Sequence, residues 1–338
     1  MQPTIIGLDI AKSVFQVHGV DAAANVAVVR KLRRSQVEPF FAKLPPCRVA
    51  LEACASAHHW ARTIGALGHD ARLISPQHAK AYVRRNKTDA ADAAAICEAA
   101  SRPHMRFVPV KTPERQAVLS MHKARALLVN QRVRLANALR AHMAEYGLVA
   151  PTGRKGFAKL RERLERTPAD MPAPLVRALM AQLQPLDALE IAIAAIEAEI
   201  LAWHRHTPDS RRLAEIPGVG PLIASGLAAS LTEPGVFRSA RDFAASLGLT
   251  PRIDATAGKA RLGPISKRGD PYLRRLLIGG AHAVLHTSRA KADPWIARLL
   301  AEKPRAKVAA ALANKIARTA WVILARGETY RPGSLIAA

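Results

Sequence analysis

Four carboxylates in the first hundred residues have the types and spacing of a metal site. Asp9 lies in a run of strand-forming residues, and Glu52 follows the apolar run Val49–Leu51. Asp89 and Asp92 are three residues apart, so they share one face of a predicted helix. Crowded carboxylates repel each other unless a cation is bound between them. The four acids therefore predict a site for one or two Mg²⁺ ions, which in phosphodiester chemistry activate an attacking oxygen and stabilise a leaving oxygen.

Each acid also has a purely structural explanation. Asp9 could begin a turn, and Asp89 could cap a helix whose N-terminus also favours Asp92. Taken alone, the Asp89 and Asp92 pair is better explained by helix capping. The metal hypothesis therefore rests on the appearance of all four acids in this order.

A glycine-rich turn, Gly218-Val219-Gly220, separates two predicted helices. Such a turn exposes backbone N–H groups at a helix start, where a DNA phosphate binds without sequence preference, as in a helix-hairpin-helix. The alternative is a tight turn in which Gly218 and Gly220 supply only a positive φ. The surrounding positive charge favours the phosphate-binding hypothesis.

A basic, glycine-containing segment from Gly248 to Arg275 gives the strongest nucleic-acid signal. It is predicted to be a loop that leads into a helix beginning at Pro271 and places cations on a phosphate backbone. A merely solvated loop does not favour so many like charges together. The candidate contacts are Arg252, Lys259, Arg261, Ser266, Lys267 and Arg268.

The charge of the whole chain points to a polyanionic partner. The 338 residues include 51 Lys and Arg against 26 Asp and Glu, a net charge of +25. Basic membrane binders concentrate charge on one amphipathic helix, whereas Arg here recurs from Arg30 to Arg331. The longest uncharged run, Ile216–Thr232, is too short to require a membrane span. Nucleic acid is the leading partner class, with no membrane.

The cysteines and the N-terminus indicate the reducing cytoplasm. Cys47, Cys54 and Cys97 form no CxxC pair and are odd in number, so neither a disulfide framework nor a cysteine zinc site is indicated. Asp9 and Lys12 interrupt the apolar start before a signal-peptide core forms, so no export is expected.

Strands followed by helices predict that a mixed α/β domain positions the acids. The first two strand-like segments are expected to form a β-hairpin. The strand-like segments are Thr4–Val20, Asn25–Val29, Arg48–Leu51 and Ala71–Ile74. The helix-like segments are Gln36–Lys43, one around Trp60, one beginning at Pro76, and Asp89–Ala100.

Long helices are predicted after this domain. Pro113–Tyr146 contains no internal breaker and is followed by Gly147, and Pro151–Pro174 is expected to be a loop or partly disordered. A second helix carries the seam of a coiled coil or bundle, which packs either on the first helix or on another subunit. The seam comprises Leu186, Leu189, Ile193, Ile196, Ile200 and Trp203. Three domains are expected, at residues 1–110, 111–206 and 207–338.

The motifs in this order resemble the insertion-sequence transposases that join a RuvC-like DEDD domain to a C-terminal serine domain, kin of the Piv DNA invertase. The likeness covers nearly the whole chain. The segments that carry it are Gly7–Lys12, Leu51–Ala53, Lys87–Asp92, Ile216–Gly220, Gly248–Arg252 and Ile265–Gly269.

This resemblance implies a ribonuclease-H-like domain, a coiled-coil connector, and a helical C-terminal domain with a helix-hairpin-helix. It implies Mg²⁺ held by Asp9, Glu52, Asp89 and Asp92. It also implies a homo-tetramer, a dimer of dimers, that gathers donor and target DNA in the bacterial cytoplasm at the nucleoid. A structured non-coding RNA, the bridge RNA, would pair with both DNAs, and this RNA dependence follows from the resemblance alone.

The chain departs from the family at one catalytic position. Members carry a nucleophilic serine between the Thr-Pro-Arg turn and the Gly-Lys pair, and this chain has Ala255 there, followed by Thr256. The alternatives are an engineered Ser→Ala change, a nucleophilic Thr256, or a decayed element. As written, the enzyme is expected to be inactive in recombination.

Three functions fit these residues. The first is a recombinase, and the second is a metal-dependent nuclease resembling a junction resolvase, which needs no protein hydroxyl. The third is a non-catalytic nucleic-acid-binding protein. Cleavage of supercoiled DNA separates the third from the others, and a covalent protein–DNA adduct separates the first from the second.

Overall fold

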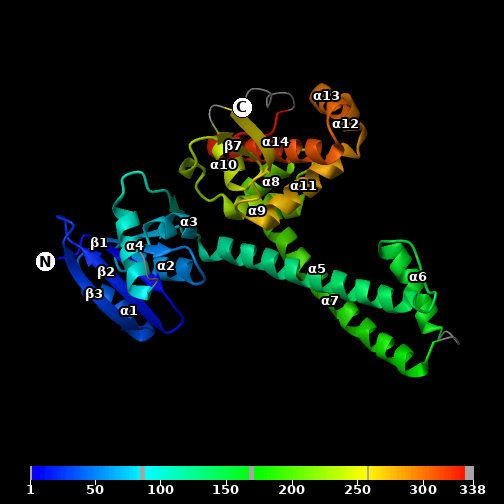
Figure 1. Ribbon diagram of the computed structural model, residues 1–338, viewed down its shortest axis with the longest axis horizontal. Coiled ribbons are helices and arrows are strands. Elements are labelled where there is room, and N and C mark those ends of the chain that lie inside the picture. Colours follow the sequence, from blue (N-terminus) through cyan, green and yellow to red (C-terminus); the bar gives the residue numbers. More distant parts are fainter. Residues whose placement is uncertain (1, 84–87, 167–170, 257–258, 332–338) are drawn as a thin grey trace. The chain divides into compact units, whose positions relative to one another are not determined.

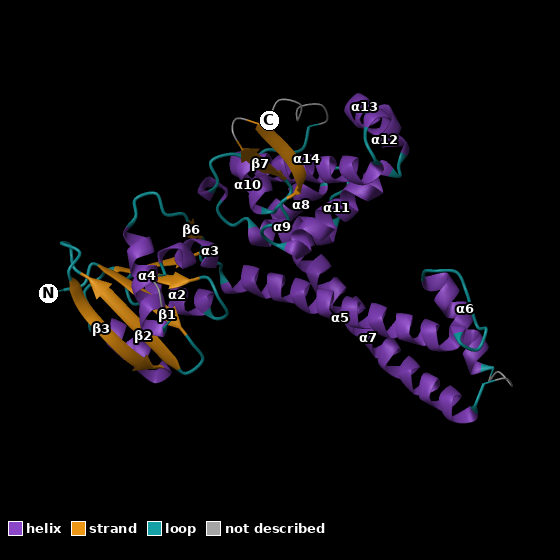
Figure 2. Ribbon diagram, viewed as in Figure 1, coloured by secondary structure: helices purple, strands orange, loops and turns teal. Residues whose placement is uncertain are grey.

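A computed structural model describes residues 2–83, 88–166, 171–256 and 259–331 of the chain, which divides into two compact units (Figures 1 and 2). Unit 1 comprises residues 1–112 together with 232–236. Unit 2 comprises residues 113–231 and 237–338, and thus holds both the predicted connector and the predicted C-terminal domain. The chain therefore crosses between the units three times.

Unit 1 is built on a six-stranded sheet in the order β3-β2-β1-β4-β5-β6. Strands β1, β4 and β5 are parallel, and the other three are antiparallel to their neighbours. The strands are β1 (Ile5–Ile10), β2 (Val14–Val20), β3 (Val26–Arg33), β4 (Arg48–Glu52), β5 (Asp70–Ile74) and β6 (Phe107–Val108). The helices are η1 (Arg34–Gln36), α1 (Val37–Phe41), α2 (Ala57–Ala66), α3 (Pro76–Ala79), η2 (Lys80–Tyr82), α4 (Asp89–Ser101) and, from the later segment, η3 (Pro234–Val236).

The predicted mixed α/β domain is confirmed, with one correction to its first strands. The segment Thr4–Val20 is two antiparallel strands, β1 and β2, because the chain turns at residues 11–13. The hairpin lies between β2 and β3, where Asp21 Oδ1 accepts hydrogen bonds from the backbone N–H groups of Ala23 and Asn25, both at 2.9 Å.

Strand alternation assigns the two faces of the sheet to different helices. Ile6 and Leu8 of β1 are buried in one core with α1 and α2, as are Val49 and Leu51 of β4. Ala50 is buried on the opposite face, against α4. Because successive residues of a strand face opposite sides, the odd-numbered residues of β1 and the even-numbered residues of β4 face α4.

Gly7 is the point at which α4 crosses the sheet. A Cβ on Gly7 would lie 2.2 Å from the Ala93 carbonyl oxygen and 2.4 Å from the Cys97 backbone nitrogen. The backbone of α4 thus rests directly on β1, and only glycine permits this approach. The contact fixes the position of the whole helix along the strand.

Replacing Gly7 by Ala is expected to destabilise unit 1 by about 1–3 kcal/mol or more, because the added methyl group pushes α4 away from β1. Hydrogen–deuterium exchange of peptides from β1 and α4 measures the effect. The matched control is Gly65→Ala in α2, where an added Cβ meets nothing within 4 Å. Equal protection in the parent and the Gly7→Ala variant would contradict the contact.

Unit 2 is almost entirely helical. Its long helices are α5 (Pro113–Ala144), α6 (Arg154–Glu165) and α7 (Ala173–His206). Its C-terminal helices are α8 (Pro208–Ala214), α9 (Pro221–Ser230), α10 (Ala240–Ser246), α11 (Pro271–Leu285), α12 (Ser288–Ala292), α13 (Pro294–Glu302) and α14 (Arg305–Arg326). The prediction of a loop over Pro151–Pro174 is wrong for α6, whose Leu160 and Leu164 are buried against α5 and α7.

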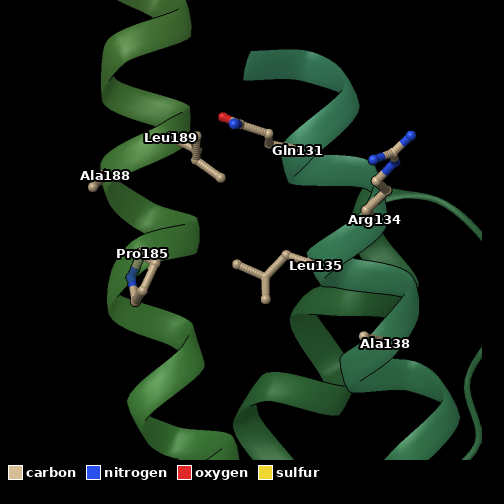
Figure 3. A pocket seen from close by; sticks show the side chains of 7 residues that line it. All are labelled: Gln131, Arg134, Leu135, Ala138, Pro185, Ala188 and Leu189. Atoms are coloured by element: carbon tan, nitrogen blue, oxygen red, sulfur yellow. The ribbon is translucent and has the colours of Figure 1, made fainter. Parts of the chain in front are cut away.

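The predicted seam lies along α5 of the same chain. Leu186, Ile193 and Ile200 of α7 are buried, and Pro185 of the same helix lies at a hollow between α7 and α5. A mostly apolar cavity of about 700 Å³ opens there, with Leu135 of α5 pointing toward α7 (Figure 3). Contact of this seam with another subunit stays a prediction.

The C-terminal helices share one core, and α14 runs through it. This helix is long and apolar enough to cross a membrane by length and composition alone, yet 56% of its most apolar window is buried inside the protein. Val308, Leu312 and Ile316 face the core. The burial of these residues accounts for the apolar character of α14, as in the core helix of a globular unit.

A buried histidine fastens α5 to this core. His122 is 1% exposed, with Nδ1 2.8 Å from the Tyr272 hydroxyl and Nε2 3.0 Å from Ser225 Oγ. Since Ser225 donates to the Pro221 carbonyl at 2.7 Å, the neutral ring donates from Nε2 and accepts at Nδ1. Burial, together with the Arg125 charge, lowers the pKa of His122 to about 4.

The stability of unit 2 is expected to fall as the pH drops from about 6.5 to about 4. In this window His122 binds a proton in the unfolded chain, whereas in the folded protein, with its pKa near 4, the ring stays neutral. The loss between pH 7 and pH 4 is on the order of 3 kcal/mol. Urea unfolding at a series of pH values measures it. The dependence of the free energy of unfolding on pH should become weaker in His122→Gln. It should persist in His142→Gln, which changes an exposed residue of the same helix.

Candidate metal centre and nucleic-acid interface

Asp9 and Glu52 lie side by side at the carboxyl ends of two parallel strands. The register pairs Leu8 with Leu51, so the next pair across β1 and β4 is Asp9 and Glu52. Both residues are at positions that face α4, and both are half-buried. Asp9 belongs to β1, so the alternative in which it begins a turn is wrong.

Asp89 and Asp92 lie in the first turn of α4. The helix is capped by Thr88, whose hydroxyl accepts a hydrogen bond from the backbone N–H of Ala91 at 3.2 Å. The interpretation of Asp89 as the capping residue is therefore wrong, because the Thr88 hydroxyl, and not the Asp89 carboxylate, caps the helix. The predicted helix over Asp89–Ala100 is confirmed.

The four acids act on one another electrostatically. Burial and the neighbouring carboxylates of Asp92, Asp89 and Glu52 raise the pKa of Asp9 to about 6. Because charges act in this way only at short range, the fold gathers the four predicted acids at one end of the sheet. The Gly7 contact explains how, since it holds the start of α4 beside the end of β1.

The donor set fits a hard divalent cation. Among the described residues, no three His, Cys, Asp or Glu side chains are grouped closely enough to hold a metal ion as they lie. Asp89 is exposed, whereas Asp9, Glu52 and Asp92 are half-buried. A bound cation would offset their repulsion and draw the carboxylates together. Within the same described residues, no cationic side chain forms an ion pair with any of the four. Carboxylate oxygens are the ligands that Mg²⁺, Mn²⁺ and Ca²⁺ prefer.

Two positioning residues, Gly7 and Thr88, are not among the predicted site residues. A glycine inside an apolar strand signals a close backbone approach, and a threonine before a helix signals a cap. Both signals were present in the sequence.

The glycine turn between α8 and α9 is used mainly for packing. Gly218 has φ of +83°, and a Cβ there would lie 2.7 Å from the Gly280 carbonyl oxygen of α11. Gly220, by contrast, is exposed, and a Cβ there would meet nothing within 4 Å. Phosphate binding at this turn stays a prediction, and within the turn Gly220 is the residue with room for it.

The predicted basic loop is a β-hairpin, which corrects the sequence analysis. Strand β7 (Pro251–Thr256) pairs with β8 (Lys259–Ile265), and Ala255 and Thr256 pair with Ala260 and Lys259. The partners Ile253 and Leu262 are 66% and 74% exposed, so the hairpin projects from the core. Arg252 and Arg261 are exposed on it, while Ala257 and Gly258 lie outside the described residues.

The segment after the hairpin is held rigidly against the end of α10. Ser266 donates its backbone N–H to the Thr250 carbonyl at 2.8 Å, and the Arg274 guanidinium donates to the carbonyls of Leu247 and Arg268, each at 3.0 Å. Lys267 adopts φ of +56°, and both Lys267 and Arg268 are exposed. The predicted Pro-started helix α11 follows, capped by the Asp270 carboxylate.

A mixed sheet with acids at the ends of its parallel strands, in a strongly cationic chain, is typical of enzymes that process nucleic acids. Comparison with known proteins makes this class specific. The model described as "Transposase IS116/IS110/IS902 family" matches residues 210–295, and a transposase model named for the DEDD domain of IS110 elements matches residues 6–148. The chain belongs to this IS110/IS116 family of transposases.

Relatives match over nearly their full lengths. A probable family 20 transposase of Pseudomonas aeruginosa is 51% identical over 97% of this chain and 98% of its own. The transposase for insertion sequence element IS1328 of Yersinia enterocolitica is 40% identical over 97% and 98%. That for element IS1111A of Coxiella burnetii is 40% identical over 98% and 92%. The sheet of unit 1, with helices on both faces, is compatible with a ribonuclease-H-like DEDD domain, and such a domain implies dependence on a divalent metal.

Mn²⁺ is expected to raise the melting temperature, because it binds the folded acids only and adds about 2.7 kcal/mol to the free energy of unfolding at one hundred times the Kd. Asp9→Asn is expected to raise the melting temperature without metal, since it relieves the crowding, and to abolish the response to Mn²⁺. Differential scanning fluorimetry at pH 7.5 measures both. Asp21→Asn, in an exposed turn of the same unit, should leave both values unchanged. An undiminished response in Asp9→Asn would show that the ion binds elsewhere.

Proposed function

We propose that the chain is a metal-dependent recombinase that cuts and rejoins DNA at the ends of an insertion sequence. The observation that carries this proposal is the placement of Asp9 and Glu52 side by side at the ends of β1 and β4, with Asp89 and Asp92 in the first turn of α4. This crowding contributes to the raised pKa of Asp9, about 6. So much negative charge in one place is unfavourable unless a cation offsets it. The family supports the substrate, because a transposase acts on DNA.

Asp9, Glu52, Asp89 and Asp92 are proposed as the metal ligands. Bound Mg²⁺ would supply an activated attacking oxygen and charge stabilisation for the leaving oxygen of a phosphodiester. The protein's own contribution is placement. Parallel pairing sets Asp9 beside Glu52, and the α4 backbone on Gly7 sets the two helix-borne acids over them.

DNA is proposed to contact unit 2 through its exposed cations. Arg252 and Arg261 project on the hairpin, and Lys267 and Arg268 lie on the rigid loop after it. Lys259 and Ser266 belong to the same basic segment, and Gly220 offers an open backbone approach for phosphate. The net charge of +25 supports binding of more than one nucleic acid.

The finer expectations of the resemblance remain part of the proposal. They are a bridge RNA that guides target and donor recognition, a homo-tetramer, kinship with the Piv invertase, and a serine-type C-terminal domain. The charge of the chain is consistent with the RNA partner, and the long α5 and α7 offer surfaces for assembly. The first test is to sequence the nucleic acid that co-purifies with the protein.

Ala255 is proposed to occupy the position of the family's nucleophilic serine. Recombination through a covalent protein–DNA intermediate needs a protein hydroxyl to hold the cut end, because attack by water releases that end. Ala255 has no hydroxyl, and Thr256 is its neighbour in β7. Without a hydroxyl nucleophile, the acids alone would support the second candidate function, a metal-dependent nuclease.

Asp9→Ala and Asp92→Ala are expected to abolish Mg²⁺-dependent cleavage of supercoiled DNA while DNA binding persists. The loss should exceed a hundredfold, because removal of one ligand disorganises the site. Agarose-gel nicking assays measure cleavage, and fluorescence anisotropy measures binding. Asp21→Asn, which removes a carboxylate outside the site and keeps the Oδ1 acceptor of its turn, is the control. Cleavage at the parental rate in Asp9→Ala would show that the site is wrongly assigned.

The Ala255→Ser variant separates the recombinase from the nuclease. With Mg²⁺ and the co-purifying RNA, it is expected to form a covalent protein–DNA adduct, visible on a denaturing gel, which the chain as written does not form. An adduct from the unmodified chain that disappears in Thr256→Ala would make Thr256 the nucleophile. Cleavage without adduct in every form would favour the nuclease.

A further inference from the structure

A basic pocket lies at the same end of the unit 1 sheet as the acids. Its volume is about 680 Å³, and it lies between the β1–β2 turn, the end of β3 and the first turn of α2. Three cations, a histidine and one tryptophan ring are among its lining residues. The residues that matter are Lys12, Arg33, Arg34, His59 and Trp60.

The Trp60 ring holds the Arg34 side chain of the pocket in place. Trp60 is 3% exposed and packs edge-on against Phe15, with ring centroids 5.0 Å apart. The Arg34 guanidinium lies 5.1 Å from the centre of the Trp60 ring. Its Nη1 also donates to the Lys12 carbonyl at 3.4 Å. A guanidinium held on an aromatic face has less rotamer freedom to lose when it binds a ligand.

The charges of the pocket are available to a ligand. Among the described residues, Lys12, Arg33 and Arg34 form no ion pair with a carboxylate, and all three are exposed. Glu38 is the acid that lines the pocket beside them. Three full cations against one carboxylate leave a net positive concavity, which attracts an anion.

The chemistry favours a phosphodiester over a nucleobase. The Trp60 ring is buried and its face is covered by Arg34, so no surface is free for a base to stack on. What remains is a set of guanidinium, ammonium and imidazole N–H donors that come from separate elements. Such a set recognises backbone phosphate oxygens without reading sequence.

The position of the pocket relates it to the acids. Lys12 comes three residues after Asp9, and α2, which carries Trp60, begins shortly after Glu52. Pocket and acids therefore share the carboxyl-terminal end of β1, with the acids on the face that carries α4 and Trp60 of the pocket on the face that carries α2. We propose that this pocket binds the backbone phosphate of a DNA strand and positions the strand at the acids, an inference that rests on the proposed function for the identity of DNA as the substrate.

The test uses the full chain in EDTA, so that it does not depend on cleavage or on the metal. Anisotropy of a fluorescent DNA duplex is measured at several salt concentrations for the parent and for Lys12→Gln/Arg34→Gln. The matched control is Arg30→Gln/Lys31→Gln, which removes two exposed cations from β3 outside the pocket. A charge-preserving variant, Lys12→Arg/Arg34→Lys, accompanies them, and thermal melting verifies folding.

The pocket variant is expected to lower the slope of log affinity against log salt by about 1.8, or about 0.9 for each lost contact, and to weaken binding about tenfold. The control and the charge-preserving variant should keep the parental slope. If the slope fell equally in the control, the pocket would contribute only its charge to a general attraction for DNA, and the proposal would fail. An unchanged slope in the pocket variant would also overturn the proposal. Selective loss of RNA binding would assign the pocket to RNA and also overturn it.

Cleavage then tests the positioning role separately. In Mg²⁺, the pocket variant is expected to raise the KM for DNA about tenfold and to lower kcat as well, because a strand that the pocket no longer holds reaches the acids less often in the reactive geometry. If Asp9→Ala still cleaved DNA while the pocket variant lost binding, the metal assignment would fail and the pocket would stand. A raised KM with parental kcat would reduce the pocket to simple binding and overturn the positioning role.

Discussion

The close contact between two backbones is the constraint on which unit 1 depends. Where α4 meets β1, no side chain separates the helix from the strand, because Gly7 contributes none. A layer of side chains would hold the helix further from the sheet and carry its first turn away from the strand ends. The electrostatic coupling of the acids is thus a consequence of packing rather than of any direct bond between them.

In unit 2, glycines also allow close contact between backbones, here around the turn between α8 and α9 and the loop after the hairpin. Gly218 lies against Gly280, and Gly248 and Gly269 bring the loop after the hairpin against α10, each at a distance that a Cβ would prevent. Because backbone atoms make these contacts, the fold of the loop does not depend on its exposed cationic side chains. Lys267 and Arg268 can therefore remain in solvent on a backbone that is itself fixed.

Local patterns in the sequence were sufficient for the strands, the long helices and the four acids, because alternation and helical spacing are set within a few residues. These patterns failed where the local composition suggests a loop but contacts with distant segments form a strand or a helix. The hairpin Pro251–Ile265 contains glycine and many charges and resembles a loop, and its pairing becomes visible only across strands. Helix α6 is polar along much of its length and forms because Leu160 and Leu164 find a core that other segments supply. The basic pocket joins three separated segments, so no local motif could reveal it.

The path of the chain limits how evolution can rearrange this protein. Residues 232–236 belong to unit 1 although the sequence on either side of them belongs to unit 2. A gene fragment that stops at Thr112 would therefore encode an incomplete unit 1, and one that starts at Pro113 would carry a stray piece of it. Recombination between related elements can exchange the two halves only when the donor of the second half supplies a matching 232–236 segment. Exchange of a short stretch within one half leaves the packing of residues 232–236 on unit 1 intact, whereas exchange of a whole half replaces one side of it.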